Sequence, residues 1–234
     1  MDRWLTFWSI IILLSCQSEQ NNTGNISPGN LSQSTSNSNE TQIEFDTLLD
    51  SEAYLVLGSE PSEIIILKEN EVDRYPTFNI LDKYRNEVIL GKNNKQTQFK
   101  IFKKYQPTST FEEFSTKVYS GNLAAPDFES APDAKRFHTR IEEECSKGIN
   151  FAGHFTLVIW GCGSSCQSGV VVDRITGKIY DGYSTSLGAE FRKDSRLLIA
   201  NVGAINPATK MIELCPYCEV SHEVWTGTRF KEIE

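Results

Sequence analysis

The chain has 234 residues, of which 39% are hydrophobic, and its formal net charge is −8. A chain of this length buries one core, or one core with a small additional module, so three domains are excluded. An acidic protein gains nothing from counterion release on a phosphate backbone, and we therefore expect no nucleic acid partner.

The N-terminus is typical of an exported protein. Residues 1–15 place a positive charge at Arg3 before an apolar run over residues 4–14, which is too short to span a bilayer. This pattern predicts a signal peptide. An ordinary cleaved signal or a short membrane anchor is the alternative to the lipid anchor considered next.

The apolar run ends in Leu13-Leu14-Ser15-Cys16, which resembles the lipobox of bacterial lipoprotein precursors. In that family the cysteine is acylated, for example with palmitate, and becomes the new N-terminus. The resemblance implies lipidation of Cys16, attachment to a membrane, and a cell-envelope location facing the periplasm or the cell exterior. Because Gln17 is not aspartate, it further implies the outer membrane if the cell is Gram-negative.

Residues 16–42, the predicted lipidated cysteine and a tether, are composed almost entirely of Asn, Ser, Thr, Gln and Gly after Cys16. So few apolar groups cannot offset the loss of chain entropy on folding. We expect a disordered tether that holds the folded part near the membrane.

Residues 43–110 contain a series of short strand-like segments and no catalytic motif. Strands are predicted over 63–68, 77–81, 87–90 and 98–102, with a polar turn over 83–86. They make a small antiparallel sheet that either stands alone or extends the sheet of residues 111–234.

The main helix is predicted over about residues 131–147. Ser130 is its expected N-cap, Pro132 suits the first turn, and Gly148 is expected to terminate it. Four residues at helical spacing form one stripe that faces a core, so His138 and Arg140, which lie off it, are expected to be solvated. The stripe consists of Ala134, Phe137, Ile141 and Cys145.

Residues 150–180 carry the strongest strand signal. Residues 155–160 are apolar on both faces and are therefore predicted to form an interior strand. A second strand over 170–172 leads into a turn in which the Asp173 carboxylate accepts backbone hydrogen bonds and Gly177 takes a positive φ. The chain returns over 178–180.

A further buried strand is predicted over 196–200, and a closing hairpin over 223–230 turns at Thr226-Gly227. One helix among many short antiparallel strands indicates an α+β fold for residues 111–234, the domain that carries the cysteine motif.

Several motifs from residue 119 to residue 230 resemble a group of uncharacterised exported bacterial proteins and lipoproteins. The resemblance implies an envelope location and a shared architecture, and no activity. It is carried by Asn150-Phe151-Ala152-Gly153-His154, Trp160-Gly161-Cys162-Gly163 with Cys166, Asp173 with Thr176-Gly177-Lys178, and Asp194-Ser195-Arg196-Leu197-Leu198.

Five cysteines remain after Cys16. Disulfides among Cys162, Cys166, Cys215 and Cys218 are the leading interpretation for an exported chain, with Cys145 as a buried thiol. A four-thiolate structural zinc site and free thiols are the alternatives. Cys215-Pro216-Tyr217-Cys218 has the same sequence as the active-site motif of glutaredoxins, but the hairpin predicted after it does not provide the helix N-terminus that such a motif needs.

Asn150, His154, Trp160 and Gln167 form the candidate binding surface. His154 is a possible base for a hydrolase that would use Cys162, Asp173 or Asp194, and Cys162 with Cys166 is a possible redox pair. The preferred hypothesis is a non-catalytic envelope module that binds a protein, peptide or glycan. It requires no cofactor and no metal.

Overall fold

The computed structural model describes residues 43–92 and 97–233. The predicted signal peptide (1–15), the lipidation site Cys16 and the tether (16–42) lie outside these residues. Within the described ranges, no helix is both long enough and apolar enough to cross a membrane.

Residues 46–104 form a β-module built from two antiparallel sheets. One has the order β1-β2-β6-β12 and the other β3-β5-β4. They enclose a core whose most buried members are Tyr54, Val56 and Ile89. The elements are β1 (Asp46–Asp50), β2 (Tyr54–Gly58), β3 (Glu63–Lys68), the 3-10 helix η1 (Glu69–Arg74), β4 (Asn79–Tyr84), β5 (Glu87–Lys92) and β6 (Phe99–Lys104).

The strand β12 (Met211–Glu213) belongs to the second half of the chain, yet it pairs with β6. Leu214, directly after β12, packs against the core of the β-module. The boundary expected between residues 110 and 111 is therefore crossed by a strand pairing. Residues 42–234 form one compact unit.

The second half has a helical segment and two further antiparallel sheets, ordered β7-β8-β9 and β10-β11-β13-β14. The expected α+β architecture, mostly antiparallel sheet with one main helical segment, is therefore present. Its elements are η2 (Pro132–Phe137), α1 (His138–Ser146), β7 (Phe155–Gly163), β8 (Cys166–Asp173), β9 (Ile179–Thr185), β10 (Ala189–Phe191), β11 (Leu197–Ala200), η3 (Val202–Ala204), β13 (Ser221–Trp225) and β14 (Phe230–Ile233).

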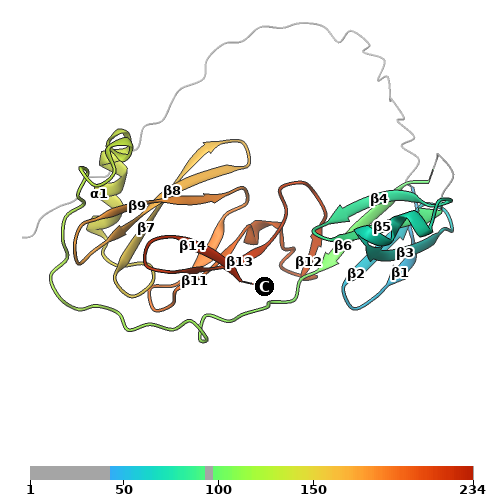
Figure 1. Ribbon diagram of the computed structural model, residues 1–234, viewed down its shortest axis with the longest axis horizontal. Helices are drawn as coiled ribbons and strands as arrows, with labels where there is room; N and C mark the ends of the chain where they lie inside the picture. The colour runs from blue at the N-terminus through green and yellow to red at the C-terminus, as the bar shows by residue number, and fades with distance from the viewer. Residues whose placement is uncertain (1–42, 93–96, 234) are drawn as a thin grey trace, which may run out of the picture. The chain divides into compact units, whose positions relative to one another are not determined.

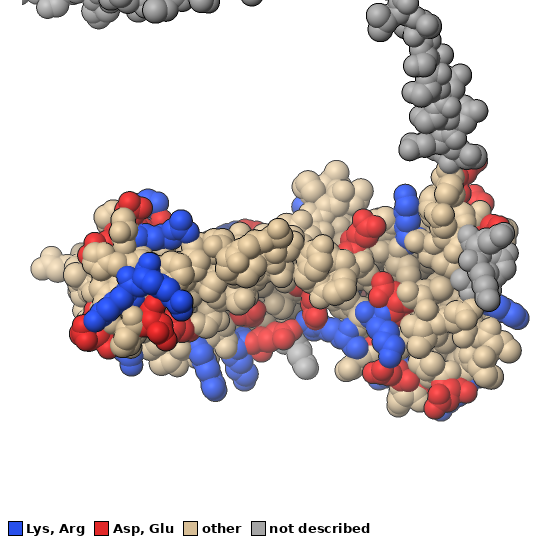
Figure 2. Space-filling model, turned by 90° about the horizontal axis from the view of Figure 1, so that it is seen from above, with Lys and Arg blue, Asp and Glu red and all other residues tan. Residues whose placement is uncertain are grey.

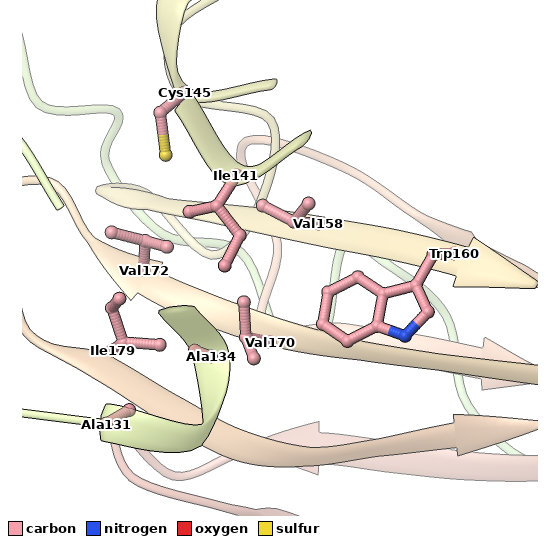
Figure 3. Packing of buried hydrophobic residues seen from close by; sticks show 9 residues of the cluster. All are labelled: Ala131, Ala134, Ile141, Cys145, Val158, Trp160, Val170, Val172 and Ile179. Atoms are coloured by element: carbon pink, nitrogen blue, oxygen red, sulfur yellow. The ribbon is translucent and has the colours of Figure 1, made fainter. Parts of the chain in front are cut away.

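The sheet β7-β8-β9 is covered on both faces (Figure 1). On one face the predicted stripe of η2 and α1 packs against alternate residues of the strands, among them Val158, Trp160 and Val170 (Figure 3). On the other face Leu157 and Val171 pack with residues of β11 and β13, including Trp225. Because successive side chains of each strand point to opposite faces of the sheet, the same three strands contribute to two hydrophobic cores.

The helix occupies residues 132–146, close to the predicted 131–147, but its first turns are 3-10. Ser130 is not its N-cap: the cap is Ala131, without a side-chain hydrogen bond. The Ser130 hydroxyl donates to the Asp127 carbonyl at 2.6 Å and accepts from the Ile179 amide at 2.9 Å. Its hydrogen bonds therefore join the segment before the helix to β9.

The prediction of an interior strand over residues 155–160 is wrong in one respect. In the strand order β7 is the edge strand of its sheet, next to β8, and at its start Phe155 also forms a bridge to Phe151. Both faces of β7 are apolar because a helix covers one and a second sheet covers the other. Covered faces do not require that a strand also have a neighbouring strand on each edge. The backbone N–H and C=O groups on the edge of β7 that faces away from β8 need other hydrogen-bond partners.

Candidate functional site

Asn150 supplies two of the hydrogen bonds that this free edge of β7 needs. Its side-chain Oδ1 accepts from the Leu157 amide at 2.7 Å, and its Nδ2 donates to the Leu157 carbonyl at 2.9 Å. The side-chain amide thus forms the two bonds that a residue of a neighbouring strand would form. Asn150, a member of the candidate binding surface, is occupied in holding the edge of β7.

His154 lies directly before β7, with its side chain about 35% exposed. Its Nε2 is 3.8 Å from Oδ1 of Asp173, and its ring centroid is 4.0 Å from that of Phe155. The Asp173 carboxylate also accepts from the Ile175 amide at 2.8 Å and from the Thr176 hydroxyl at 2.8 Å, as the predicted turn requires. His154 and Asp173 are thus neighbours at one end of the sheet.

Four of the cysteines form two disulfides, as expected, and each disulfide closes a short loop. Cys162 is bonded to Cys166 at the β7–β8 hairpin tip, and Cys215 to Cys218 in the loop between β12 and β13. Cys145 is a free, buried thiol, and burial raises its pKa. Since the four paired sulfurs are not thiolates, they do not form the zinc site considered above. Cys162 also lies at the opposite end of β7 from His154, so the two do not form a nucleophile pair.

Trp160 and Gln167 are near the hairpin tip but face opposite sides of the sheet. Trp160 belongs to the helix-covered face, with Val158 and Val170. The Gln167 Oε1 accepts from the Thr185 hydroxyl at 3.3 Å and lies 3.5 Å from the Tyr183 hydroxyl, and Tyr183 packs into the core on the other face. With His154 six residues before Trp160, or about 20 Å along a strand, the structure does not bring the four candidate residues together.

An aromatic ridge forms where the helical segment meets the hairpin. The Phe137 and Trp160 rings stack with their centroids 4.1 Å apart and an interplanar angle of 21°. The Trp160 side chain is largely buried and lies at the margin of the core (Figure 3). The ridge separates two hollows, of about 420 and about 310 Å³. We call the ridge and both hollows the Trp160 groove.

The first hollow is lined by cationic side chains. Lys135 and His138 have acidic partners, Glu129 at 2.6 Å and Glu142 at 3.3 Å. Among the described residues, neither Arg136 nor Arg140 has an ion-pair partner, and the Arg136 guanidinium lies 5.5 Å from the Phe137 ring. Two positive charges therefore remain available to an anionic group.

The second hollow carries both signs of charge. Asp133 and Asp181 line it, together with Arg136, which lines both hollows, and Cys162 of the hairpin disulfide. Figure 2 shows cationic and acidic side chains next to each other at the end of the protein that carries α1. A ligand lying across the ridge would therefore meet cationic side chains in the first hollow and two carboxylates beside Arg136 in the second.

Gly161 keeps the groove open. A Cβ atom added there would meet nothing within 4 Å, and the residue does not have a positive φ. Gly169, which lines the second hollow, is different, because its Cβ would lie 2.2 Å from the Val158 carbonyl oxygen. Gly169 is thus required for strand packing, whereas the missing side chain of Gly161 leaves room at the surface.

Sequence reasoning found Trp160 and placed Phe137 on the core stripe, but it missed that the two rings stack. It assigned Arg140 to solvent, where the structure also places it, without assigning it a role. The sequence did offer a signal for this site: Phe137, an aromatic residue of the core stripe, lies in a helical turn rich in cationic residues. Comparisons with protein-family models, with curated proteins and with solved structures find no match.

Proposed function

We propose that this protein is a lipid-anchored lipoprotein of the bacterial cell envelope whose folded unit is a non-catalytic binding module. Three features support the proposal: the sequence at Cys16, the polar tether that follows it, and two disulfides that each close a short loop. Disulfides persist in oxidising compartments outside the cytosol. The anchor would hold the module near a membrane while the tether lets it reorient.

The Trp160 groove is the proposed binding site, and the observation that carries this assignment is the presence of both signs of charge beside the aromatic ridge. Arg140 lines the first hollow, Asp133 and Asp181 line the second, and Arg136 lines both. Aromatic rings provide apolar contact area at low entropic cost, and flanking charges fix orientation. The arrangement fits a peptide chain that carries both carboxylate and amino groups. In a bacterial envelope, the peptides of the cell wall are of this class, and a glycan chain is the alternative ligand.

Two experiments test the proposal separately. For the anchor, cells would be grown with labelled palmitate and fractionated: label on the wild-type chain and its loss in Cys16→Ala are expected. An unlabelled wild-type chain in the soluble envelope fraction would contradict the anchor.

For the groove, the unlipidated mature chain, residues 17–234, would be sedimented with purified cell-wall sacculi and then with their separated peptide and glycan fragments. Gly161→Val places a side chain in the open space, where a Cβ atom meets nothing within 4 Å, and is expected to lower binding at least tenfold. Arg136→Gln is expected to lower it several-fold. The matched control is Arg229→Gln, an exposed arginine on the closing hairpin. Equal binding by all four proteins would refute the groove as the site.

A thiol–disulfide oxidoreductase is the second candidate, favoured by one observation: Cys162, exposed and disulfide-bonded, lines the groove. A glutathione redox titration separates the two functions. A potential between about −120 and −230 mV would support the redox enzyme, whereas one below about −300 mV would support a structural disulfide.

A further inference from the structure

A second, smaller cavity lies where the returning chain meets the β-module. Its volume is about 90 Å³. The turn between β4 and β5 contributes Tyr84 and Arg85, the end of β6 contributes Lys103 and Tyr105, and β13 contributes His222. Since a water molecule takes up about 30 Å³ in the liquid, the cavity has room for one small polar group and not for a large ligand.

The charge of this cavity is unusual for a protein with a net charge of −8. Its lining residues include three cationic side chains, Arg85, Lys103 and Lys104, and none of them is Asp or Glu. Two of the three cations have carboxylate partners outside the lining. Lys104 pairs with Asp50 at 2.5 Å, and Arg85 pairs with Glu219 and, at 2.6 Å, with Glu232.

Lys103 is the cation without such a partner. Within the described ranges, its ammonium makes no ion pair and lies 3.6 Å from the centroid of the Tyr84 ring. Its side chain is half-buried, and burial lowers the pKa of Lys103 below its usual value although the Glu87 carboxylate acts to raise it. That carboxylate instead accepts a hydrogen bond from the Tyr54 hydroxyl at 2.6 Å. A half-buried ammonium without an anion is costly, and a bound anion would remove that cost.

Neutral hydrogen-bonding groups complete the wall. The Tyr105 hydroxyl lies 3.1 Å from Nε2 of His222, and the two rings are nearly parallel. Burial and the nearby Arg85 lower the pKa of His222, so its ring is neutral at pH 7. If Nε2 carries the proton, His222 donates to the tyrosine oxygen, and the Tyr105 O–H is then free to donate to a ligand.

The backbone of Arg85 adds a separate observation. Its φ is 52°, in the left-handed region that a non-glycine residue seldom occupies. The turn holds this conformation while the guanidinium spans Glu219 and Glu232, two residues of the returning chain. These two ion pairs join the β4–β5 turn to the returning chain at the cavity.

We propose that this cavity binds a single oxyanion, the carboxylate or phosphate group of a small ligand, with the Lys103 ammonium as its charge partner and Tyr105 as a hydrogen-bond donor. Lysine binds oxyanions as a compact point charge. The site uses none of the residues of the Trp160 groove, so it does not depend on the proposed function, and either assignment can fail alone.

The test uses the mature chain in a chloride buffer at constant ionic strength, titrated separately with sodium phosphate and sodium acetate by calorimetry. Saturable binding of one ion per chain is expected for at least one of them, and the preferred ion tells a phosphate ligand from a carboxylate ligand. Lys103→Gln should weaken the affinity at least tenfold. The control Lys100→Gln lies on the same strand with its ammonium over Phe45, 4.5 Å from the ring centroid, and should change the affinity less than twofold.

Absence of saturable binding by either ion, or equal affinity of Lys103→Gln and wild type, would overturn the proposal. If Lys103→Gln does not fold, as judged by circular dichroism, Tyr105→Phe replaces it, because this variant keeps the ring and removes the hydroxyl. At least threefold weaker binding is expected for Tyr105→Phe, together with a ligand-dependent shift of the His222 ring resonances in the wild type. An unchanged affinity and an unmoved ring would overturn the proposal.

Discussion

Replacing Asn150 by alanine tests whether this residue holds the edge of β7 or binds a ligand. The substitution removes both hydrogen bonds to Leu157, whose exposed fraction is only 2%. Each buried backbone group left without a partner costs about 1–3 kcal/mol. Because Asn150 itself is half-buried, water can reach part of the vacated space, and we expect a loss of about 2–4 kcal/mol. That is a large fraction of the 5–15 kcal/mol typical of a folded domain.

Urea unfolding followed by tryptophan fluorescence measures the loss. The matched control is Asn206→Ala, because the Asn206 side chain also accepts two backbone amide bonds, at 3.0 and 3.1 Å, but in an exposed turn. Water can replace those bonds, so the control should lose less than about 1 kcal/mol. Asn150→Asp should be at least as destabilised as Asn150→Ala near pH 7, since a carboxylate cannot donate to the Leu157 carbonyl. Equal stability of Asn150→Ala and Asn206→Ala would refute the structural role, and loss of sacculus binding at unchanged stability would restore Asn150 to the binding surface.

Three further predictions concern buried polar groups. The pKa of His222 is lowered by burial and by Arg85. The stability that neutral His222 contributes is therefore fully present above about pH 6.5 and is lost as the pH falls through the folded-state pKa. Urea midpoints at pH 7.5 and 5.5 should differ more in wild type than in His222→Gln, and equal differences would contradict this. Arg174 is buried, with its guanidinium bonded to the carbonyls of Ala124 and Cys145 and to the Thr156 hydroxyl. Arg174→Lys should cost about 1–3 kcal/mol in urea unfolding, because an ammonium cannot span these acceptors; an unchanged midpoint would contradict it. The Cys145 thiol should react with a maleimide slowly in the native chain and rapidly in urea, as measured by intact mass, and fast native labelling would show that it is accessible.

Features governed by neighbours in the sequence were predictable. The strand over residues 63–68 has the expected bounds, and the turn from Asp173 to Gly177 forms its expected side-chain bonds, with Gly177 at a φ of 86°. The helical stripe ending in Cys145 faces the core for the same reason, since a period of 3.6 residues leaves few alternatives. The sequence also indicated two disulfides among the four cysteines, but it did not decide between pairing within each short loop and the crossed pairing.

Features that depend on distant partners were not predictable. The strand β12 is three residues long and becomes a strand because β6, about a hundred residues earlier, offers a free edge. Sequence alone does not show that Asn150 would serve as a strand neighbour, since an asparagine before an apolar run is equally typical of a turn. The small cavity beside Lys103 forms only where β4, β6, β12, β13 and β14 meet, and none of these strands carries a motif. The spacing of apolar residues along a strand or helix predicts which face is buried, but it does not predict which other element covers that face.

The hairpin disulfide links the fold to the proposed site. Pairing holds the body of β7 to β8 from Phe155 to Gly161 and continues, after an irregularity, between Gly163 and Cys166, where the disulfide closes the tip. Closing so short a ring stabilises a chain by only about 2 kcal/mol on entropic grounds. Its larger effect is local, because the same tip carries Gly161 and Cys162, which line the two hollows of the Trp160 groove. A rigid tip fixes the shape of the groove before a ligand arrives, which lowers the entropic cost of binding. The disulfide can therefore be dispensable for folding and still be required for binding.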